Sequence, residues 1–149
     1  MIVVDASLAA KWVLWEDHSD RALAFLSLHR ANLCGPDLIV IEVAGAIARV
    51  ARMAKLDPID SAQLLELWFG DFGAAAVDTR RPDKALLRFA AQLSIDLDHP
   101  IQDCLYLAMA IDLDADLATC DEKFVRKAEK HHPRVRLLAS YDLNLPPLT

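Results

Sequence analysis

Four carboxylates occupy positions from which they could meet at one site. The apolar run IVV ends in Asp5, and the run LATC ends in Asp121. Glu42 interrupts the apolar stretch LIVIEVAGAI, and Asp103 lies near the start of the helical pattern HPIQDCLYLAMAIDL. Clustered carboxylates repel one another, so a shared site would need one or two cations. Hard oxygen ligands suit Mg²⁺ or Mn²⁺, which activate water and stabilise the charge on a phosphodiester under attack.

Each acid taken alone also has a structural explanation. Asp5 and Asp121 precede helical patterns and could cap those helices. Asp103 could complement the positive end of its helix dipole. Glu42 could lie on a solvated stripe of its helix, although an unpaired carboxylate among apolar neighbours would be costly to bury. The metal-site hypothesis is the one that accounts for all four acids together.

The elements that must position these acids alternate between apolar strands and amphipathic helices. Strands that are apolar on both faces indicate an α/β fold with a parallel sheet covered on both sides. Ligands in such folds bind at the carboxyl ends of the strands, where Asp5 and Asp121 fall. We predict strands at 2–5, within 31–38 (broken by Gly35-Pro36), at 73–78, 115–121 and 134–139, and helices at 7–17, 18–30, 38–56, 58–72, 81–95, 99–113 and 122–132.

Length and composition favour one domain that spans residues 1–149 and has a substantial core. The net charge of −6 argues against a protein that coats nucleic acid through a basic face, but it does not exclude a nuclease with a metal-binding acid cluster. The three cysteines follow no zinc spacing and imply no disulfide framework, which favours a reducing cytoplasm. No apolar run approaches the ~18 residues of a membrane span, so we expect no membrane association.

Four segments of the sequence resemble the signature segments of PIN-domain proteins, in the family's order and spacing. They are IVVDASLAAKW, IEVAGAI, PIQDCLYLAMAI and LATCDEKF. The length and the near-complete coverage of the chain are most similar to VapC toxins of type II toxin–antitoxin pairs. The resemblance implies a three-layer α/β/α sandwich with a central parallel sheet. It also implies RNA cleavage that depends on Mg²⁺ or Mn²⁺, with one or two ions bound.

The resemblance also assigns roles to residues and partners. The family's acidic quartet maps onto Asp5, Glu42, Asp103 and Asp121, and its polar helpers onto Ser7 and Thr119. The implied partners are a VapB-like antitoxin that neutralises the toxin, an RNA substrate (tRNA, rRNA or mRNA), and a second copy of the chain in a homodimer or a higher toxin–antitoxin assembly. HPIQD beside the third acid and Cys120 before the fourth depart from the commonest pattern, but neither removes a ligand.

Basic and aromatic side chains suggest where RNA would lie. Arg49 is seven residues after Glu42 on one helix and therefore near the same face, with Arg52 three residues further on. These arginines and Lys11 could line a phosphate track, although a solvated basic face explains the arginines equally well. Trp12 and Trp15 are spaced for one helix face and could stack bases, but we expect packing in the core or a partner groove.

Two other functions compete with the nuclease. A catalytically silent PIN-like module that binds RNA or protein would retain the fold, but such a scaffold tends to lose an acid of the quartet. A phosphotransfer domain would need an acidic pair or a DxD motif at the first strand. The sequence has DAS at this position and contains no glycine-rich phosphate loop.

Overall fold

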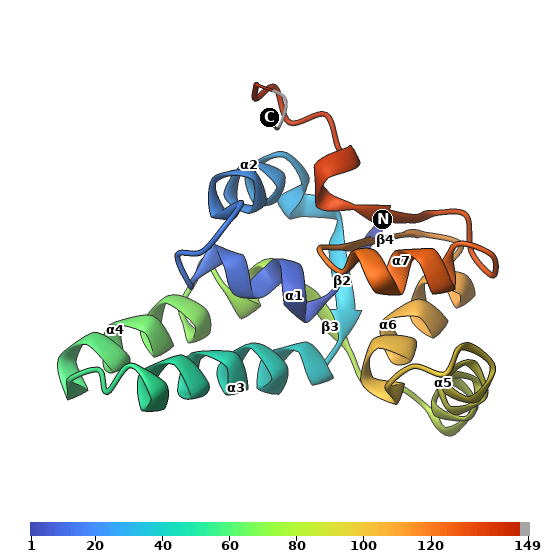
Figure 1. The fold of residues 1–149 in the computed structure, drawn as a ribbon, viewed down its shortest axis with the longest axis horizontal. Coiled ribbons are helices and arrows are strands. Elements are labelled where there is room, and N and C mark those ends of the chain that lie inside the picture. Colours follow the sequence, from blue (N-terminus) through green and yellow to red (C-terminus); the bar gives the residue numbers. More distant parts are fainter. Residues whose placement is uncertain (147–149) are drawn as a thin grey trace.

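A computed structural model, which describes residues 1–146, contains a parallel sheet of five strands in the order β3-β2-β1-β4-β5 (Figure 1). Each neighbouring pair of strands is parallel, as the apolar strand patterns predict. The strands are β1 Ile2–Val4, β2 Leu33–Pro36, β3 Asp78–Arg80, β4 Asp116–Thr119 and β5 Val135–Leu137.

Helices cover both faces of this sheet, which confirms the predicted three-layer α/β/α class. Helix α6 packs along β1, β2 and β4, and α5 lies against α6. Helices α3 and α4 lie side by side and extend away from the sheet (Figure 1). The helices are α1 Ala6–Ala9, α2 Ser19–His29, α3 Leu38–Met53, α4 Pro58–Phe69, α5 Lys84–Leu97, α6 Ile101–Asp112 and α7 Glu122–Ala128, with short 3₁₀ turns η1 Ala10–Trp12, η2 Arg30–Asn32, η3 Ala74–Ala76 and η4 Leu138–Ser140.

The central strand β1 fixes where the first acid lies. All three of its residues are buried, and Val4 pairs with Ala118 of β4. The backbone N–H of Asp5 then donates to the Ala118 carbonyl at 3.2 Å, so the ladder continues to the acid itself. Asp5 is therefore held at the carboxyl end of the most central strand.

The predicted helix over 7–17 is wrong in its second half. Helix α1 and turn η1 end at Trp12, which is buried, whereas Trp15 lies beyond them and is 80% exposed. Ser19 explains the break, because its buried hydroxyl donates to the Leu14 carbonyl at 2.9 Å and accepts from the Glu16 N–H at 3.0 Å. These bonds stabilise a turn where a continued helix would need the same backbone groups.

Two strand predictions also need correction. Gly35-Pro36 does not break β2, since both residues belong to it and Gly35 lies so near β1 that an added Cβ would be 3.3 Å from the Val4 carbonyl oxygen. The strand predicted at 73–78 begins only at Asp78. Ala74–Ala76 instead form η3, because alanine favours helical over extended backbone.

Several helix boundaries differ from the predicted ones, since α4 ends at Phe69 and not at residue 72, and α7 ends at Ala128 and not at residue 132. Helix α3 ends at Met53 and not at residue 56, and α5 begins after Asp83, whose side chain accepts from the Leu86 N–H at 2.8 Å. Pro100 is the N-cap of α6 and not a residue of its first turn. Within residues 1–146, no helix is long and apolar enough to cross a membrane.

Candidate active site

Asp5 is a buried carboxylate held by three hydrogen bonds. Only 4% of its surface is exposed. Its Oδ1 accepts from the Leu8 N–H at 3.1 Å and from the Ser7 hydroxyl at 2.8 Å, and its Oδ2 accepts from the Thr119 hydroxyl at 2.5 Å. The bond to Leu8 makes Asp5 the N-cap of α1, which is the structural role that the sequence suggests for this residue. Capping and ligand roles are compatible, because the carboxylate has further lone pairs.

Ser7 and Thr119 link the first acid to the fourth. Their hydroxyl oxygens lie 3.3 Å apart, and each also contacts Asp5. The Thr119 hydroxyl accepts from the Asp121 N–H at 3.1 Å, and the Ser7 hydroxyl accepts from the Cys120 N–H at 3.1 Å. The two predicted helpers thus fix the ends of β1 and β4 relative to each other, which sets the positions of both acids.

Burial raises the pKa of Asp5 to about 6, against the hydrogen bonds from Thr119, Ser7 and Leu8, which lower it. The negative charge of Asp103 adds a smaller upward effect on this pKa. A carboxylate that is costly to ionise in isolation is stabilised in its charged form by a nearby cation. The site around Asp5 is therefore electrostatically suited to a positive ion.

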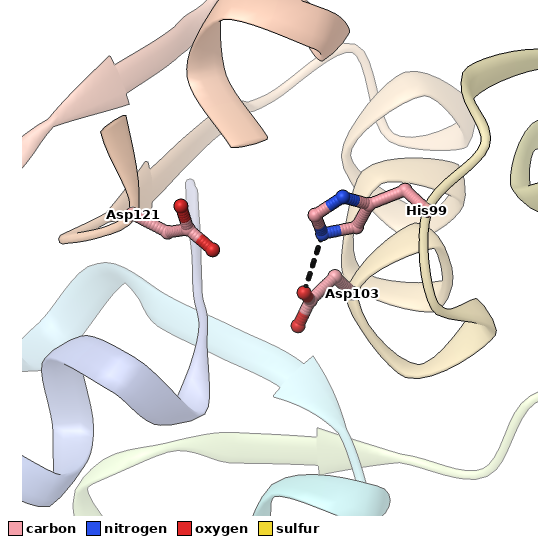
Figure 2. A group of neighbouring side chains, drawn as sticks. All are labelled: His99, Asp103 and Asp121. Carbon is pink, nitrogen blue, oxygen red and sulfur yellow. Dashed lines mark hydrogen bonds and ion pairs between the residues drawn. The ribbon is translucent and has the colours of Figure 1, made fainter. Parts of the chain in front are cut away.

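Asp103 and Asp121 approach each other at the edge of the sheet, and His99 joins them (Figure 2). One ligand atom from each of the three residues lies within 4.8 Å of the other two. Asp121 is the N-cap of α7, since its Oδ1 accepts from the Phe124 N–H at 3.0 Å. Asp103, in the first turn of α6, contacts the His99 ring nitrogen Nε2 at 2.7 Å through Oδ2.

Glu42 projects from the first half of α3 and is held by Tyr106 of α6. The Tyr106 hydroxyl donates to Glu42 Oε1 at 2.7 Å. Partial burial raises the pKa of Glu42, against the lowering effect of this hydrogen bond, and the charge of Asp103 raises it further. Burial and the Glu42 charge also raise the pKa of Tyr106, so its hydroxyl remains a proton donor to the acid. Glu42 therefore has a dedicated polar partner and does not lie on a solvated stripe.

The donor set fits a divalent metal ion. Carboxylate oxygens are the ligands that Mg²⁺ and Mn²⁺ prefer, and one imidazole nitrogen is acceptable to Mn²⁺. The Asp103 and Asp121 ligand atoms lie within 4.8 Å of each other, which suits two carboxylates that share one ion, and a ring nitrogen of His99 lies beside them. The charge of Asp103 raises the pKa of both Asp5 and Glu42, and a ligand atom of Asp103 lies within 4.8 Å of one of Asp121. A cation would offset their mutual repulsion.

A groove of about 580 Å³ opens beside Glu42 and Asp121, between α1 and η1 on one side and α3 on the other. Glu42 and Asp121 line it, together with Lys11 and Arg49. Lys11 Nζ also binds Glu16 Oε1 at 3.2 Å and the Asp17 carbonyl at 2.9 Å, so its ammonium is held at the groove. The residues that line the groove are Ala6, Ser7, Ala10, Lys11, Leu14, Glu16, Glu42, Gly45, Ala46, Arg49, Val50, Cys120 and Asp121.

The structure separates the predicted basic residues into two groups. Lys11 and Arg49 line the groove, whereas Arg52 is exposed and does not line it in the part of the chain described. Sequence reasoning did not assign His99 or Tyr106 to the site. Tyr106 lies three residues after Asp103 and therefore on the same helix face, which was a usable signal. His99 lies four residues before Asp103, within the helix predicted over 99–113, so helical spacing was a usable signal for this contact as well.

Comparison with protein families matches residues 2–130 to the PIN domain. The chain belongs to the PIN-domain family. PIN domains are generally nucleases that use divalent metal ions, which agrees with an acidic site at this edge of the sheet. No curated protein matches the sequence significantly.

Solved structures share this PIN fold at low sequence identity. PAE2754 from Pyrobaculum aerophilum is 18% identical, with a TM-score of 0.68 over 92% of this chain and 90% of its own. FitAB bound to an IR36 DNA fragment is 18% identical, with a TM-score of 0.65 over 92% and 93%. FitAcB from Neisseria gonorrhoeae is 17% identical, with a TM-score of 0.64 over 92% and 96%. The likeness extends over nearly the whole length of each chain.

Proposed function

We propose that this PIN domain is an Mg²⁺- or Mn²⁺-dependent endoribonuclease, the toxin of a toxin–antitoxin pair of the VapC type. The observation that supports this proposal most strongly is the close approach of Asp103 and Asp121, whose ligand atoms lie within 4.8 Å of each other. Beside them opens a groove that Glu42 and Asp121 line together with two cationic side chains, Lys11 and Arg49. The acids suit a cation, and the cationic side chains suit a phosphate backbone. A protein-binding surface alone would explain neither feature.

In the proposed mechanism, Asp5, Asp103 and Asp121 hold the metal ion, with Glu42 completing the acidic site. When bound, the ion lowers the pKa of water and stabilises the charge that develops on the scissile phosphate. Ser7 and Thr119 keep both oxygens of Asp5 in fixed directions through their hydroxyl groups. Lys11 and Arg49 would bind flanking phosphates and hold the RNA along the groove.

We further propose an antitoxin partner and a cytoplasmic site of action. FitAB, which shares the fold, is bound to a DNA fragment. A VapB-like partner that binds DNA and occupies the groove of this chain would inhibit it by covering the acids. A homodimer or a higher assembly with the antitoxin accords with the VapC resemblance.

The direct test is cleavage of small structured RNAs by the purified chain. With Mg²⁺ or Mn²⁺ present we expect discrete internal cuts, and with EDTA we expect none, because the acids then lack the ion. Gel separation of end-labelled tRNA, rRNA fragments and mRNA reports both outcomes. Cleavage that persists in EDTA would refute the metal mechanism. Tight RNA binding without any cleavage would identify a silent binding module.

Arg49 and Arg52 provide a matched pair for the RNA track. Arg49→Ala is expected to weaken RNA binding by about 1 kcal/mol or more and to reduce the salt dependence of the affinity by roughly one phosphate contact. Arg52→Ala removes the same charge outside the groove and should change the affinity much less. Fluorescence anisotropy in Ca²⁺, over a series of salt concentrations, measures both quantities. Equal effects of the two variants would indicate a diffuse basic face.

A further inference from the structure

We propose that His99 is a positioning residue of the metal centre, which orients the Asp103 carboxylate by donating a hydrogen bond from Nε2–H. This inference rests on the proposed metal-dependent function. The Nε2–Oδ2 distance of 2.7 Å is that of a strong, charge-assisted hydrogen bond. This bond uses one lone pair of Oδ2, so Oδ1 of Asp103 is the oxygen that would be more accessible to a metal ion. His99 would thus decide which oxygen of the acid serves as the ligand.

The imidazole of His99 is buried and stacked on an aromatic ring, and the backbone that carries it is anchored by a hydrogen bond. Its side chain is only 7% exposed. The ring stacks on Phe124 of α7, with 4.6 Å between ring centroids and an angle of 24° between planes. The His99 carbonyl accepts from the Ser94 hydroxyl at 2.5 Å, which anchors the backbone to the end of α5. A histidine fixed in this way can fix the carboxylate that it contacts.

Lys127 selects the tautomer that this role needs. Its Nζ lies 3.4 Å from His99 Nδ1 and donates to the Asp98 carbonyl at 2.7 Å. An ammonium only donates hydrogen bonds, so Nδ1 facing it must act as the acceptor and cannot carry a proton without repulsion. The proton of the neutral ring therefore lies on Nε2, directed at Asp103. The same proton prevents Nε2 from acting as a direct metal ligand.

The contact also couples the third acid to the fourth. Phe124, on which the His99 ring stacks, donates its backbone N–H to Asp121. His99 therefore contacts Asp103 through its ring nitrogen Nε2. Through the face of its ring it contacts α7, the helix that Asp121 caps. Figure 2 shows Asp121 facing the pair formed by His99 and Asp103. Removing the imidazole would loosen both ligands, so the expected loss is one of metal affinity.

The test measures Mn²⁺ binding by titration calorimetry, without RNA. We expect H99A to bind Mn²⁺ about 10–100-fold more weakly than the unchanged protein, the usual effect of losing a partner that orients a ligand. H99Q, whose amide N–H can reach Asp103, should restore most of the affinity. H131A removes an exposed histidine elsewhere and should bind as the unchanged protein does.

Two spectroscopic measurements on the unchanged protein separate positioning from ligation. In metal-free protein, ¹⁵N NMR of the His99 ring should show the Nε2–H tautomer. With Mn²⁺ bound, pulsed electron paramagnetic resonance should show no directly coordinated imidazole nitrogen. An Nδ1–H tautomer, or a strongly coupled nitrogen, would overturn the proposal. Because both measurements use the unchanged protein, they test the positioning role of His99 even if H99A fails to fold.

The outcomes also distinguish this inference from the proposed function. If the unchanged protein does not bind Mn²⁺, the metal-dependent function itself fails. If it binds Mn²⁺ and H99A binds equally well, the metal function stands and the role of His99 is refuted. If H99Q binds as weakly as H99A, the donated hydrogen bond is not the cause of the loss, which also refutes the role.

Discussion

Asp103→Asn is expected to lower the rate of RNA cleavage by about a hundredfold or more, while the protein stays folded. Metal ions contribute several kcal/mol to transition-state stabilisation, and about 1.4 kcal/mol corresponds to a tenfold change in rate. Asparagine retains the carbonyl oxygen that can accept the His99 hydrogen bond, but it removes the charge that binds the ion. The residue lies in the first turn of α6 and is only partly buried, so its replacement should cause little strain.

Asp112→Asn is the matched control for this prediction. Asp112 is the last residue of the same helix and is exposed, and nine residues of α-helix separate it from Asp103 by roughly 13 Å. The control removes an identical charge far from the other acids. Cleavage is measured as single-turnover rates with RNA in limiting amount, and folding by circular dichroism. Equal rates for the two variants would remove Asp103 from the catalytic site.

The sequence predicts the sheet well because two of its inner strands are short, largely buried and followed by acids. β1 and β4 are of this kind, and parallel packing then places their carboxyl ends at one edge. β3 has the sequence DTR and is largely exposed at the edge of the sheet, so no hydrophobic pattern marks it. The first helix is shortened by the hydrogen bonds of one buried side chain, Ser19, which no periodicity reveals.

The candidate site is predictable only where its residues are adjacent to regular elements. Asp5 and Asp121 follow strands, and Asp103 lies in the first turn of a helix, so topology alone predicts that they lie at the same edge of the sheet. Glu42 stands out because a carboxylate interrupts an apolar run. The contact of His99 with Asp103 depends instead on the loop between α5 and α6 and on packing against Phe124. The spacing of four residues between His99 and Asp103 is a local signal for their contact, but the orientation of the imidazole is set by tertiary structure.

The second large effect expected is a dependence of stability on pH that originates in Asp5. The pKa of this carboxyl rises from 3.8 to about 6 on folding, so between these pH values the folded protein binds more protons than the unfolded chain. Stability of the metal-free protein should therefore fall as pH rises through this window, by about 3 kcal/mol at most. This loss corresponds to a decrease in melting temperature of roughly 2–4 °C per kcal/mol for a protein of this size.

Asp5→Asn should flatten this slope, because a neutral amide has no charge to desolvate. Asp57→Asn is the control, since Asp57 also caps a helix, with its Oδ1 accepting from the Asp60 N–H at 2.8 Å, but is exposed. Melting curves in EDTA from pH 4 to 7.5 should separate the two variants.

Mn²⁺ should stabilise the unchanged protein more at pH 7.5 than at pH 5, because protons and metal compete for the same carboxylate. A slope that survives in Asp5→Asn would place the titrating group elsewhere. A metal-induced stabilisation independent of pH would show that Asp5 does not bind the ion.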